Sequence, residues 1–150
     1  MRPFVLGIHA TFAALVTLVT LVTLVGCDEA GRKEAAGLDR AVMAYREAEN
    51  RHKAELAKRL ESVPCQNKDV CAAKAACLVT AKATGEGLEK KRVVEEFMAN
   101  EFPKLSPGDP KAQEMLTTLD AAEKLLVTGR DSVAPCDEAM RTLRKTYSLR

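Results

Sequence analysis

The stretch VCAAKAACLVTAKA, residues 70–83, decides the fold of this 150-residue chain. It is rich in Ala, contains neither Pro nor Gly, and follows Asp69, a common N-cap residue, so it predicts a helix. Cys71 and Cys77 lie in it six residues apart. A helix rises about 1.5 Å per residue, which separates their Cα atoms by about 9 Å, whereas a disulfide requires about 7 Å or less. These two cysteines therefore cannot bond to each other.

The sequence after residue 83 predicts further helical segments. Gly85 and Gly87 each cost about 1 kcal/mol inside a helix, so we expect a break there before the helix resumes over residues 88–101. Asp109 as N-cap and Pro110 at the first helical position begin another helix, which Gly129 ends. The last helix begins near residues 132–134 and turns Cys136 towards the core. The cations near its C-terminal end are Arg141, Arg144, Lys145 and Arg150. They complement the helix dipole. The alternative interpretation is that they contact anionic lipid or a cell-wall polymer.

The sequence before residue 70 predicts one long helix over residues 38–62, ended by Pro64. Apolar residues recur in it at steps of three and four, and His52 lies on the same stripe. A ligand or a pH switch is one reading of His52, but no second histidine lies nearby, which favours a packed residue. The stripe consists of Leu38, Val42, Tyr45, His52, Leu56, Leu60 and Val63. All segments together predict an all-α fold, a small antiparallel bundle of about four helices over residues 38–150, stapled by two disulfides.

The N-terminal region is apolar from Val5 to Val25, with Arg2 as the one charge before Asp28. It ends in Leu24-Val25-Gly26-Cys27, which resembles the lipobox of bacterial lipoproteins. The resemblance covers residues 1–27 and implies that residues 1–26 are a signal peptide that is cut off before Cys27. It also implies that the Cys27 thiol receives a diacylglyceryl group and that the new N-terminus is acylated. An uncleaved transmembrane helix is the alternative, because the run is long enough to span the membrane.

Both readings place the following domain outside the cytoplasm, at a bacterial cell membrane. Residues 28–37 are polar and small and contain two glycines, so with the lipidated Cys27 they predict a flexible tether over residues 27–37. Asp28 resembles the signal that retains some lipoproteins in the inner membrane.

Four cysteines other than Cys27 form an even set, which indicates disulfides in an exported chain. With Cys71–Cys77 excluded, two patterns remain: Cys65–Cys71 with Cys77–Cys136, or Cys65–Cys77 with Cys71–Cys136. We favour the first, because Cys65 precedes the first turn of the helix that contains Cys71. The spacing lacks the close cysteine and histidine pairs of zinc sites, so we expect no metal ligands.

The net charge and the motifs that the sequence lacks exclude several functions. The net charge of +2 gives no reason to expect a nucleic acid partner, and the sequence contains no Ser-His-Asp set and no nucleotide-binding glycine motif. We therefore expect no enzyme and no cofactor. The function predicted is a membrane-anchored extracytoplasmic lipoprotein that acts as a non-enzymatic interaction or envelope-structural module. Its partners would be membrane lipid through Cys27 and a protein of the envelope. The alternative is a helical carrier that binds a small ligand or a metal between its helices, and a deep pocket at His52 would favour it.

Overall fold

The computed structural model describes residues 29–149, and in that range the chain consists of helices and loops without a β-strand. This confirms the predicted all-α fold. The first helix occupies residues 29–47. The elements that follow are η1 (Asn50–His52), α2 (Lys53–Ser62), α3 (Lys68–Asn100), η2 (Phe102–Lys104), α4 (Pro110–Asp131) and α5 (Val133–Thr146).

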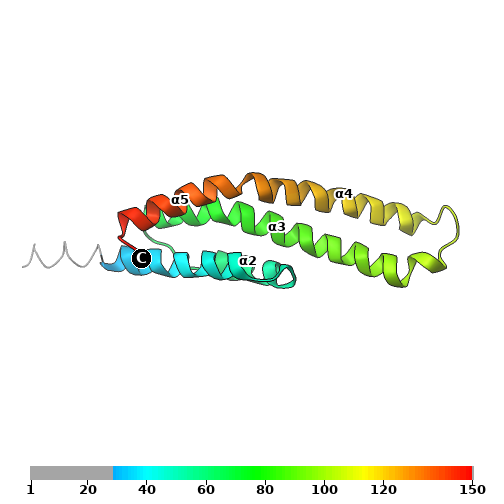
Figure 1. Cartoon of the computed structure of the whole chain (residues 1–150), viewed down its shortest axis with the longest axis horizontal. Helices are drawn as coiled ribbons and strands as arrows, with labels where there is room; N and C mark the ends of the chain where they lie inside the picture. The colour runs from blue at the N-terminus through cyan, green and yellow to red at the C-terminus, as the bar shows by residue number, and fades with distance from the viewer. Residues whose placement is uncertain (1–28, 150) are drawn as a thin grey trace, which may run out of the picture.

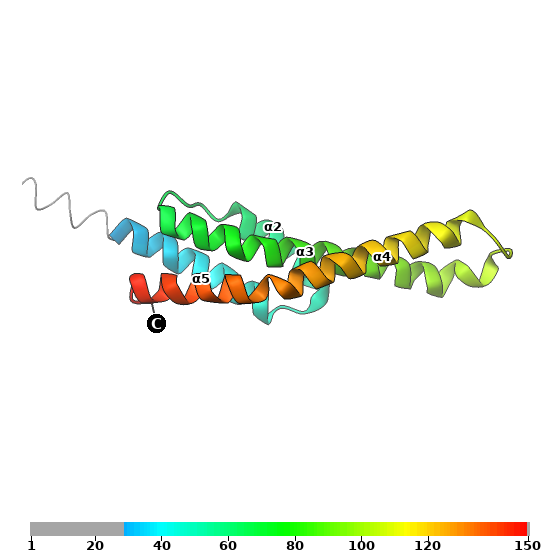
Figure 2. The same cartoon turned by 90° about the horizontal axis from the view of Figure 1, so that it is seen from above.

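The helices run back and forth along one long axis (Figure 1). α3 extends over the full length of the molecule, with α2 and α5 packed on its N-terminal part and α4 on the remainder. α4 and α5 follow one another along almost the same line and form the antiparallel return path to α3 (Figure 2). The first helix, α2, α5 and the N-terminal half of α3 make a four-helix bundle. Beyond it α3 and α4 continue as a two-helix hairpin, and we call residues 93–120 the arm.

The hydrophobic core lies in the bundle and excludes the arm. Its buried side chains come from the first helix, α2, α3 and α5, and none comes from α4. They are Ala35, Leu38, Val42, Tyr45, Ala57, Leu60, Val70, Ala73, Cys77, Ala81, Cys136, Met140, Leu143 and Tyr147. The arm buries Val94 and Phe97 outside this cluster. Most of the burial that stabilises the fold is therefore concentrated at one end of the molecule.

Two disulfides staple the bundle in the pattern that the sequence favours. Cys65 bonds to Cys71 with a Cα–Cα distance of 5.3 Å, which ties the loop before α3 to the first turns of that helix. Cys77 bonds to Cys136 with a Cα–Cα distance of 4.5 Å and joins α3 to α5 across the core.

The predicted flexible tether is wrong for residues 29–37, which are helical. Ala35 is fully buried, and Gly31 lies so close to Tyr147 that an added Cβ would be 3.0 Å from its ring. The Glu34 carboxylate accepts hydrogen bonds from the backbone N–H groups of Gln66 and Asn67, at 2.9 and 3.0 Å. The segment is thus an integral part of the bundle. Cys27 and Asp28 lie outside the described residues.

The single helix predicted for residues 38–62 is also wrong, because the chain turns after residue 47 and η1 and α2 follow as separate elements. The Lys53 ammonium donates hydrogen bonds to the carbonyl oxygens of Tyr45 and Arg46 and so caps the C-terminal end of the first helix. A cation at that end also complements the helix dipole. His52 belongs to η1 and is exposed instead of lying on the apolar stripe.

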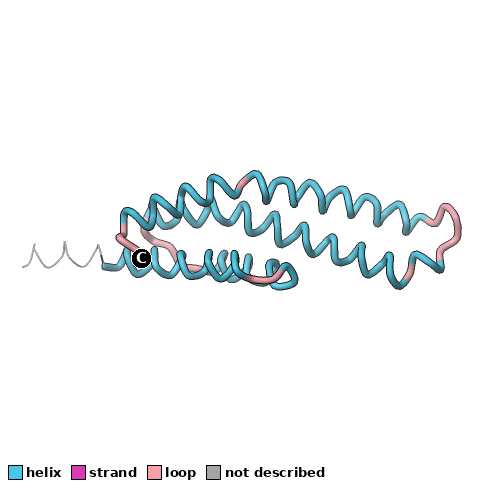
Figure 3. Tube along the Cα trace, in the orientation of Figure 1, coloured by secondary structure: helices cyan, strands magenta, loops and turns pink. Residues whose placement is uncertain are grey.

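The predicted break at Gly85–Gly87 does not exist, since α3 is continuous from Lys68 to Asn100 (Figure 3). Both glycines mark close approaches of other helices. A Cβ on Gly85 would lie 3.0 Å from the Ala54 Cα of α2, and one on Gly87 would lie 2.9 Å from the Leu126 side chain of α4. The helix propensity lost at two glycines is smaller than the packing that their absence of a side chain permits.

The helix ends were predicted with mixed success. Asp109 caps α4 by accepting from the Lys111 N–H at 2.9 Å, and Pro110 takes the first helical position, as expected. The N-cap of α3 is Asn67 instead of Asp69, and its side chain accepts from the N–H groups of Asp69 and Val70. α4 continues two residues past Gly129, to Asp131.

Candidate functional site

The arm is the first candidate site, because it carries large apolar side chains in contact with solvent. Leu116 is 56% exposed, Met98 and Phe102 are 47% exposed, and Val93 is 40% exposed. A two-helix hairpin can bury one stripe of each helix, so apolar residues beside the stripe stay open to water. Here Met98 follows the buried Phe97, and Leu116 follows the half-buried Met115. The arm thus presents an apolar surface that its own two helices do not cover.

Local contacts hold the tip of the arm in a defined shape. The rings of Phe97 and Phe102 meet edge to face with centroids 6.3 Å apart. Lys111 forms an ion pair with Glu101, and its ammonium lies 5.9 Å above the Phe97 ring. The hydrogen bond to Glu101 raises the pKa of Lys111. Gly108 takes φ +84°, a backbone conformation that favours glycine, and lets the chain enter α4.

The charged residues along this part of α3 are largely matched with one another. Arg92 forms ion pairs with Glu89 and Glu96, and Lys91 forms one with Glu95 at 3.7 Å. The hydrogen bond that Arg92 donates to Glu89, followed by the one that it donates to Glu96, raises the pKa of Arg92. Ion pairs that are exposed to solvent in this way add little to the stability of the hairpin. They leave this part of α3 without a dominant sign of charge.

A cavity on the side of the bundle, partly open to solvent, is the second candidate site. It has a volume of about 350 Å³ and lies between the first helix, α2, α3 and α5. The Cys77–Cys136 disulfide forms part of its wall. The lining residues are Val42, Tyr45, Arg46, Lys53, Leu60, Cys77, Thr80, Thr84, Val133, Cys136 and Asp137.

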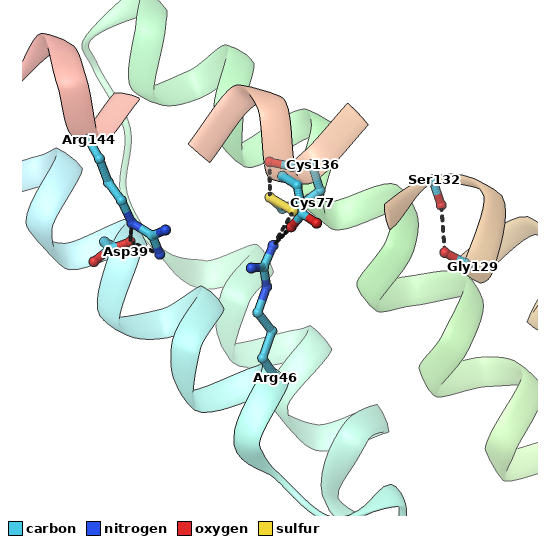
Figure 4. Close-up of a disulfide and its surroundings, with 8 residues drawn as sticks. Asp39, Arg46, Cys77, Gly129, Ser132, Cys136 and Arg144 are labelled. Carbon is cyan, nitrogen blue, oxygen red and sulfur yellow. Dashed lines mark hydrogen bonds and ion pairs between the residues drawn. A yellow bond between two sulfur atoms is a disulfide. The ribbon is translucent and has the colours of Figure 1, made fainter. Parts of the chain in front are cut away.

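The polar groups around this cavity are engaged with one another in a specific way. Arg46 points towards the disulfide, where its Nη2 lies 3.6 Å from the Cys136 Sγ, and it pairs with the Asp137 carboxylate (Figure 4). The Tyr45 hydroxyl donates to the Ala81 carbonyl at 3.4 Å, and burial raises its pKa, opposed by a hydrogen bond with Thr84. Lys53 lies 4.6 Å above the Tyr45 ring, and partial burial lowers the pKa of its ammonium.

The residues singled out in the sequence are distributed differently from these two sites. Leu24, Val25, Gly26 and Cys27 lie outside the described residues. His52 does not line this cavity, and its Nε2 accepts a hydrogen bond from the Arg51 Nε at 3.2 Å.

Two of the cations of α5 are paired with carboxylates. Arg144 pairs with Asp39 at 2.8 Å, which ties α5 to the first helix (Figure 4), and Arg141 pairs with Glu138 at 2.5 Å. Arg150 lies outside the described residues. Opposite charges therefore offset two of the cations that the alternative reading assigned to anionic lipid.

Two absences apply to residues 29–149 alone. No group of three or more His, Cys, Asp or Glu side chains in this range is placed to hold a metal ion. No helix there combines the length and the apolarity needed to cross a membrane.

Sequence reasoning missed the exposed residues of the arm and the Arg46–Asp137 pair. The apolar doublets Phe97-Met98 and Met115-Leu116 are a signal for the arm, because one helical stripe cannot bury both members. The Arg46–Asp137 pair joins positions 91 residues apart, and nothing local in the sequence indicates it.

Comparison with known proteins adds no relative. No family model, curated protein or solved structure matches the chain.

Proposed function

We propose that the protein is a lipid-anchored extracytoplasmic module that binds an envelope protein through the arm and catalyses no reaction. The observation that carries the proposal is the exposure of Val93, Met98, Phe102 and Leu116 on a hairpin that extends beyond the hydrophobic core. Large apolar side chains that are exposed outside the core are candidates for an interaction surface. The lipobox-like Leu24-Val25-Gly26-Cys27 supports the anchor.

The shape of the molecule suits such an anchored module. The described chain starts at residue 29 at one end of the long axis, and the loop between α3 and α4 lies at the other end (Figure 1). The 33 residues of α3 span about 50 Å at 1.5 Å per residue. A lipid on Cys27, two residues before the first helix, would leave little slack in the connection. The arm would then reach a partner tens of ångströms from the lipid surface.

The surface of the arm suits a modest, reversible affinity. Full burial of one large apolar side chain contributes about 1.5–3 kcal/mol, and these four side chains are already about half buried. A partner that covered them would therefore gain about 3–6 kcal/mol before the loss of translational and rotational freedom is subtracted. Additional polar contacts would be needed for tight binding.

The partner is tested by photo-crosslinking in native membranes with the full chain. We compare Leu116→Glu with Thr117→Glu, since both positions are exposed neighbours on α4 and receive the same charge. A crosslinker at Met98 should give a discrete protein adduct that Leu116→Glu reduces at least about tenfold, the effect of about 1.4 kcal/mol. Thr117→Glu should retain the adduct. Equal adducts in both variants would show that the apolar surface is not the binding site.

The anchor is tested separately with a fatty-acid analogue that can be detected on gels. Cys27→Ser should abolish labelling and leave a full-length precursor, whereas Cys65→Ser should retain the label. Equal labelling of Cys27→Ser and the unaltered chain would refute lipidation and leave the test of the arm unaffected.

A further inference from the structure

The two disulfides differ in their access to solvent. Cys77 and Cys136 are 2% and 4% exposed, so they offer solvent almost no surface although their bond forms part of the cavity wall. Cys65 and Cys71 are half-buried, so part of each residue faces solvent. A thiolate that reduces a disulfide must approach one of its sulfur atoms, so the rate depends on access to that sulfur. The folded protein therefore presents Cys65–Cys71 to a reducing thiol and shields Cys77–Cys136.

The position of Cys65–Cys71 at the start of α3 suits the release of a thiolate. Cys71 lies in the first turns of the helix, where its backbone N–H donates to the carbonyl of the N-cap residue Asn67 at 2.9 Å. The N-terminal end of a helix has a partial positive charge, which stabilises an anion close to it. The neighbouring charges of Lys68 and Asp69 offset one another. The helix dipole therefore favours the thiolate that forms when this bond breaks.

The ring that this bond closes also holds the first helix. It consists of residues 65–71, and the backbone N–H groups of Gln66 and Asn67 within it donate to the Glu34 carboxylate at 2.9 and 3.0 Å. Reduction opens the ring and gives its backbone more conformations. The entropic cost of presenting both N–H groups to one carboxylate then increases. Reduction therefore weakens the contact that holds residues 29–37.

Other contacts keep the bundle together when the ring is open. Leu38, further along the first helix, is fully buried in the core, and the Arg144–Asp39 ion pair ties that helix to α5. The buried Cys77–Cys136 bond still joins α3 to α5 and encloses the arm. The effect of reduction is therefore confined to the loop and to the N-terminal part of the first helix.

We propose that Cys65–Cys71 is a site of reversible thiol–disulfide exchange with a protein dithiol, and that its reduction releases residues 29–37 from the loop before α3. One thiolate of the dithiol bonds to a sulfur of the pair, the bond between Cys65 and Cys71 breaks, and the other cysteine leaves as a thiolate. The second thiol of the dithiol then displaces the bonded cysteine and closes a disulfide within the dithiol. Two electrons pass to Cys65 and Cys71, which take up the two protons that the dithiol loses. The exchange involves neither the arm nor its proposed partner.

The selectivity of the exchange is tested on the full chain in membranes, with reduced thioredoxin as the dithiol. New thiols are alkylated and mapped after digestion with trypsin, which separates Cys71 from Cys77 by cutting after Lys74. Cys65 and Cys71 should be alkylated at least about tenfold faster than Cys77 and Cys136, because access limits the attack. Equal rates, faster alkylation of Cys77 and Cys136, or no alkylation of Cys65 and Cys71 overturns the proposal.

The structural consequence is tested by hydrogen exchange of the same full chain after selective reduction and alkylation. Exchange in residues 29–37 should rise at least about tenfold, whereas exchange in the arm should change less than about twofold. The double variant Cys65→Ala, Cys71→Ala needs no reductant and should reproduce both results. Unchanged exchange in residues 29–37, or an equal rise in the arm, overturns the proposal.

Two glutamates of the first helix provide matched variants. Glu34→Ala removes the acceptor of both N–H groups, whereas Glu29 is exposed and Glu29→Ala leaves these hydrogen bonds intact. In Glu34→Ala, residues 29–37 should exchange faster before reduction, and reduction should add less than about threefold, because the contact is already lost. Glu29→Ala should show the full increase of at least about tenfold on reduction. Equal responses of the two variants to reduction overturn the proposal.

Discussion

Replacement of Gly129 by alanine should destabilise the fold, because this glycine is where α4 contacts α3 most closely. An ideal Cβ at Gly129 would lie 2.3 Å from the Thr84 Oγ1, 3.1 Å from the Thr84 backbone N and 3.3 Å from its Cα. A rotation of the Thr84 side chain relieves the first contact but not the two with the backbone. The Thr84 backbone or α4 must therefore give way by a few tenths of an ångström. The Ser132 hydroxyl donates to the Gly129 carbonyl at 3.1 Å, so this part of α4 is also fixed from the other side (Figure 4).

The expected size of the effect follows from two opposed terms. Overpacking of a close contact costs about 1–3 kcal/mol, and an overlap that includes backbone atoms belongs near the upper limit. Alanine gains at most about 1 kcal/mol of helix propensity over glycine, and less than that in the last turn of α4. The net loss for Gly129→Ala is therefore about 2 kcal/mol. Adding Thr84→Ala to Gly129→Ala should recover part of this loss, since it removes the Oγ1 overlap.

Gly37 supplies the matched control. It lies within the first helix, and a Cβ there would meet nothing within 4 Å, so Gly37→Ala should gain propensity without overlap, about 0.5–1 kcal/mol. The assay is urea and thermal unfolding of residues 28–150 followed by far-ultraviolet circular dichroism. At about 4 °C per kcal/mol for a chain of this size, the two variants should differ in Tm by about 10 °C. A Gly129→Ala protein at least as stable as the unaltered chain would refute the close approach of α3 and α4.

Two other predictions concern the disulfides and the response to acid. Replacing both Cys77 and Cys136 by Ala should lower the free energy of unfolding by about 4 kcal/mol, and replacing both Cys65 and Cys71 should lower it by about 2 kcal/mol. The two values differ because the bonded cysteines are 59 and 6 residues apart in the sequence. Equal losses in denaturant titrations would contradict the loop-closure reasoning. Hydrogen bonds from the backbone N–H groups of Gln66 and Asn67 lower the pKa of Glu34 below its ordinary value of 4.5. The Glu34 carboxylate therefore stabilises the fold above about pH 4.5, and this stabilisation is lost as the pH falls through the folded-state pKa. The stability difference between the unaltered chain and Glu34→Gln should thus shrink below that pH, and a difference independent of pH would show that the carboxylate is not held in this way.

The fold class and the disulfide pattern could be predicted because both depend on local geometry. Cys71 and Cys77 lie on one helix, and the rise per residue alone forbids a bond between them. The proximity of Cys65 to the first turn of α3 then selects one of the two patterns that remain. The N-cap of α4 was equally local, since Asp109 and Pro110 act within a single turn.

The N-terminal part of the first helix, residues 29–37, was missed although the sequence contained its signal. Gly31, Ala35, Leu38, Val42 and Tyr45 follow one another at steps of four and three, and all are buried. The small and polar composition of residues 28–37 was given more weight than this periodicity. Glycine and alanine on a stripe indicate a close helix contact as readily as a flexible linker, and the contact of Gly31 with Tyr147 is an instance.

The turn after residue 47 had no comparable signal. Residues 48–52 contain neither Pro nor Gly, and the charged residues around them are ordinary helix formers. The turn depends on contacts between distant parts of the chain. Lys53 caps the first helix, and Ala54 fits against the backbone at Gly85 of α3. Packing of this kind becomes visible only when the helices are placed together.

The position of the Cys77–Cys136 disulfide connects the stability of the bundle to the arm. Residues 77–136 enclose the whole arm, so this one bond fixes both ends of the hairpin at the bundle. The arm needs such a constraint, because Val94 and Phe97 are its only large side chains that are buried among the described residues. A two-helix hairpin with so small an interior gains little from its own packing and depends on the fixed positions of its ends. An oxidising compartment, as proposed for this protein, supplies the chemistry that forms the bond, and with it the rigid base from which an exposed apolar arm can act.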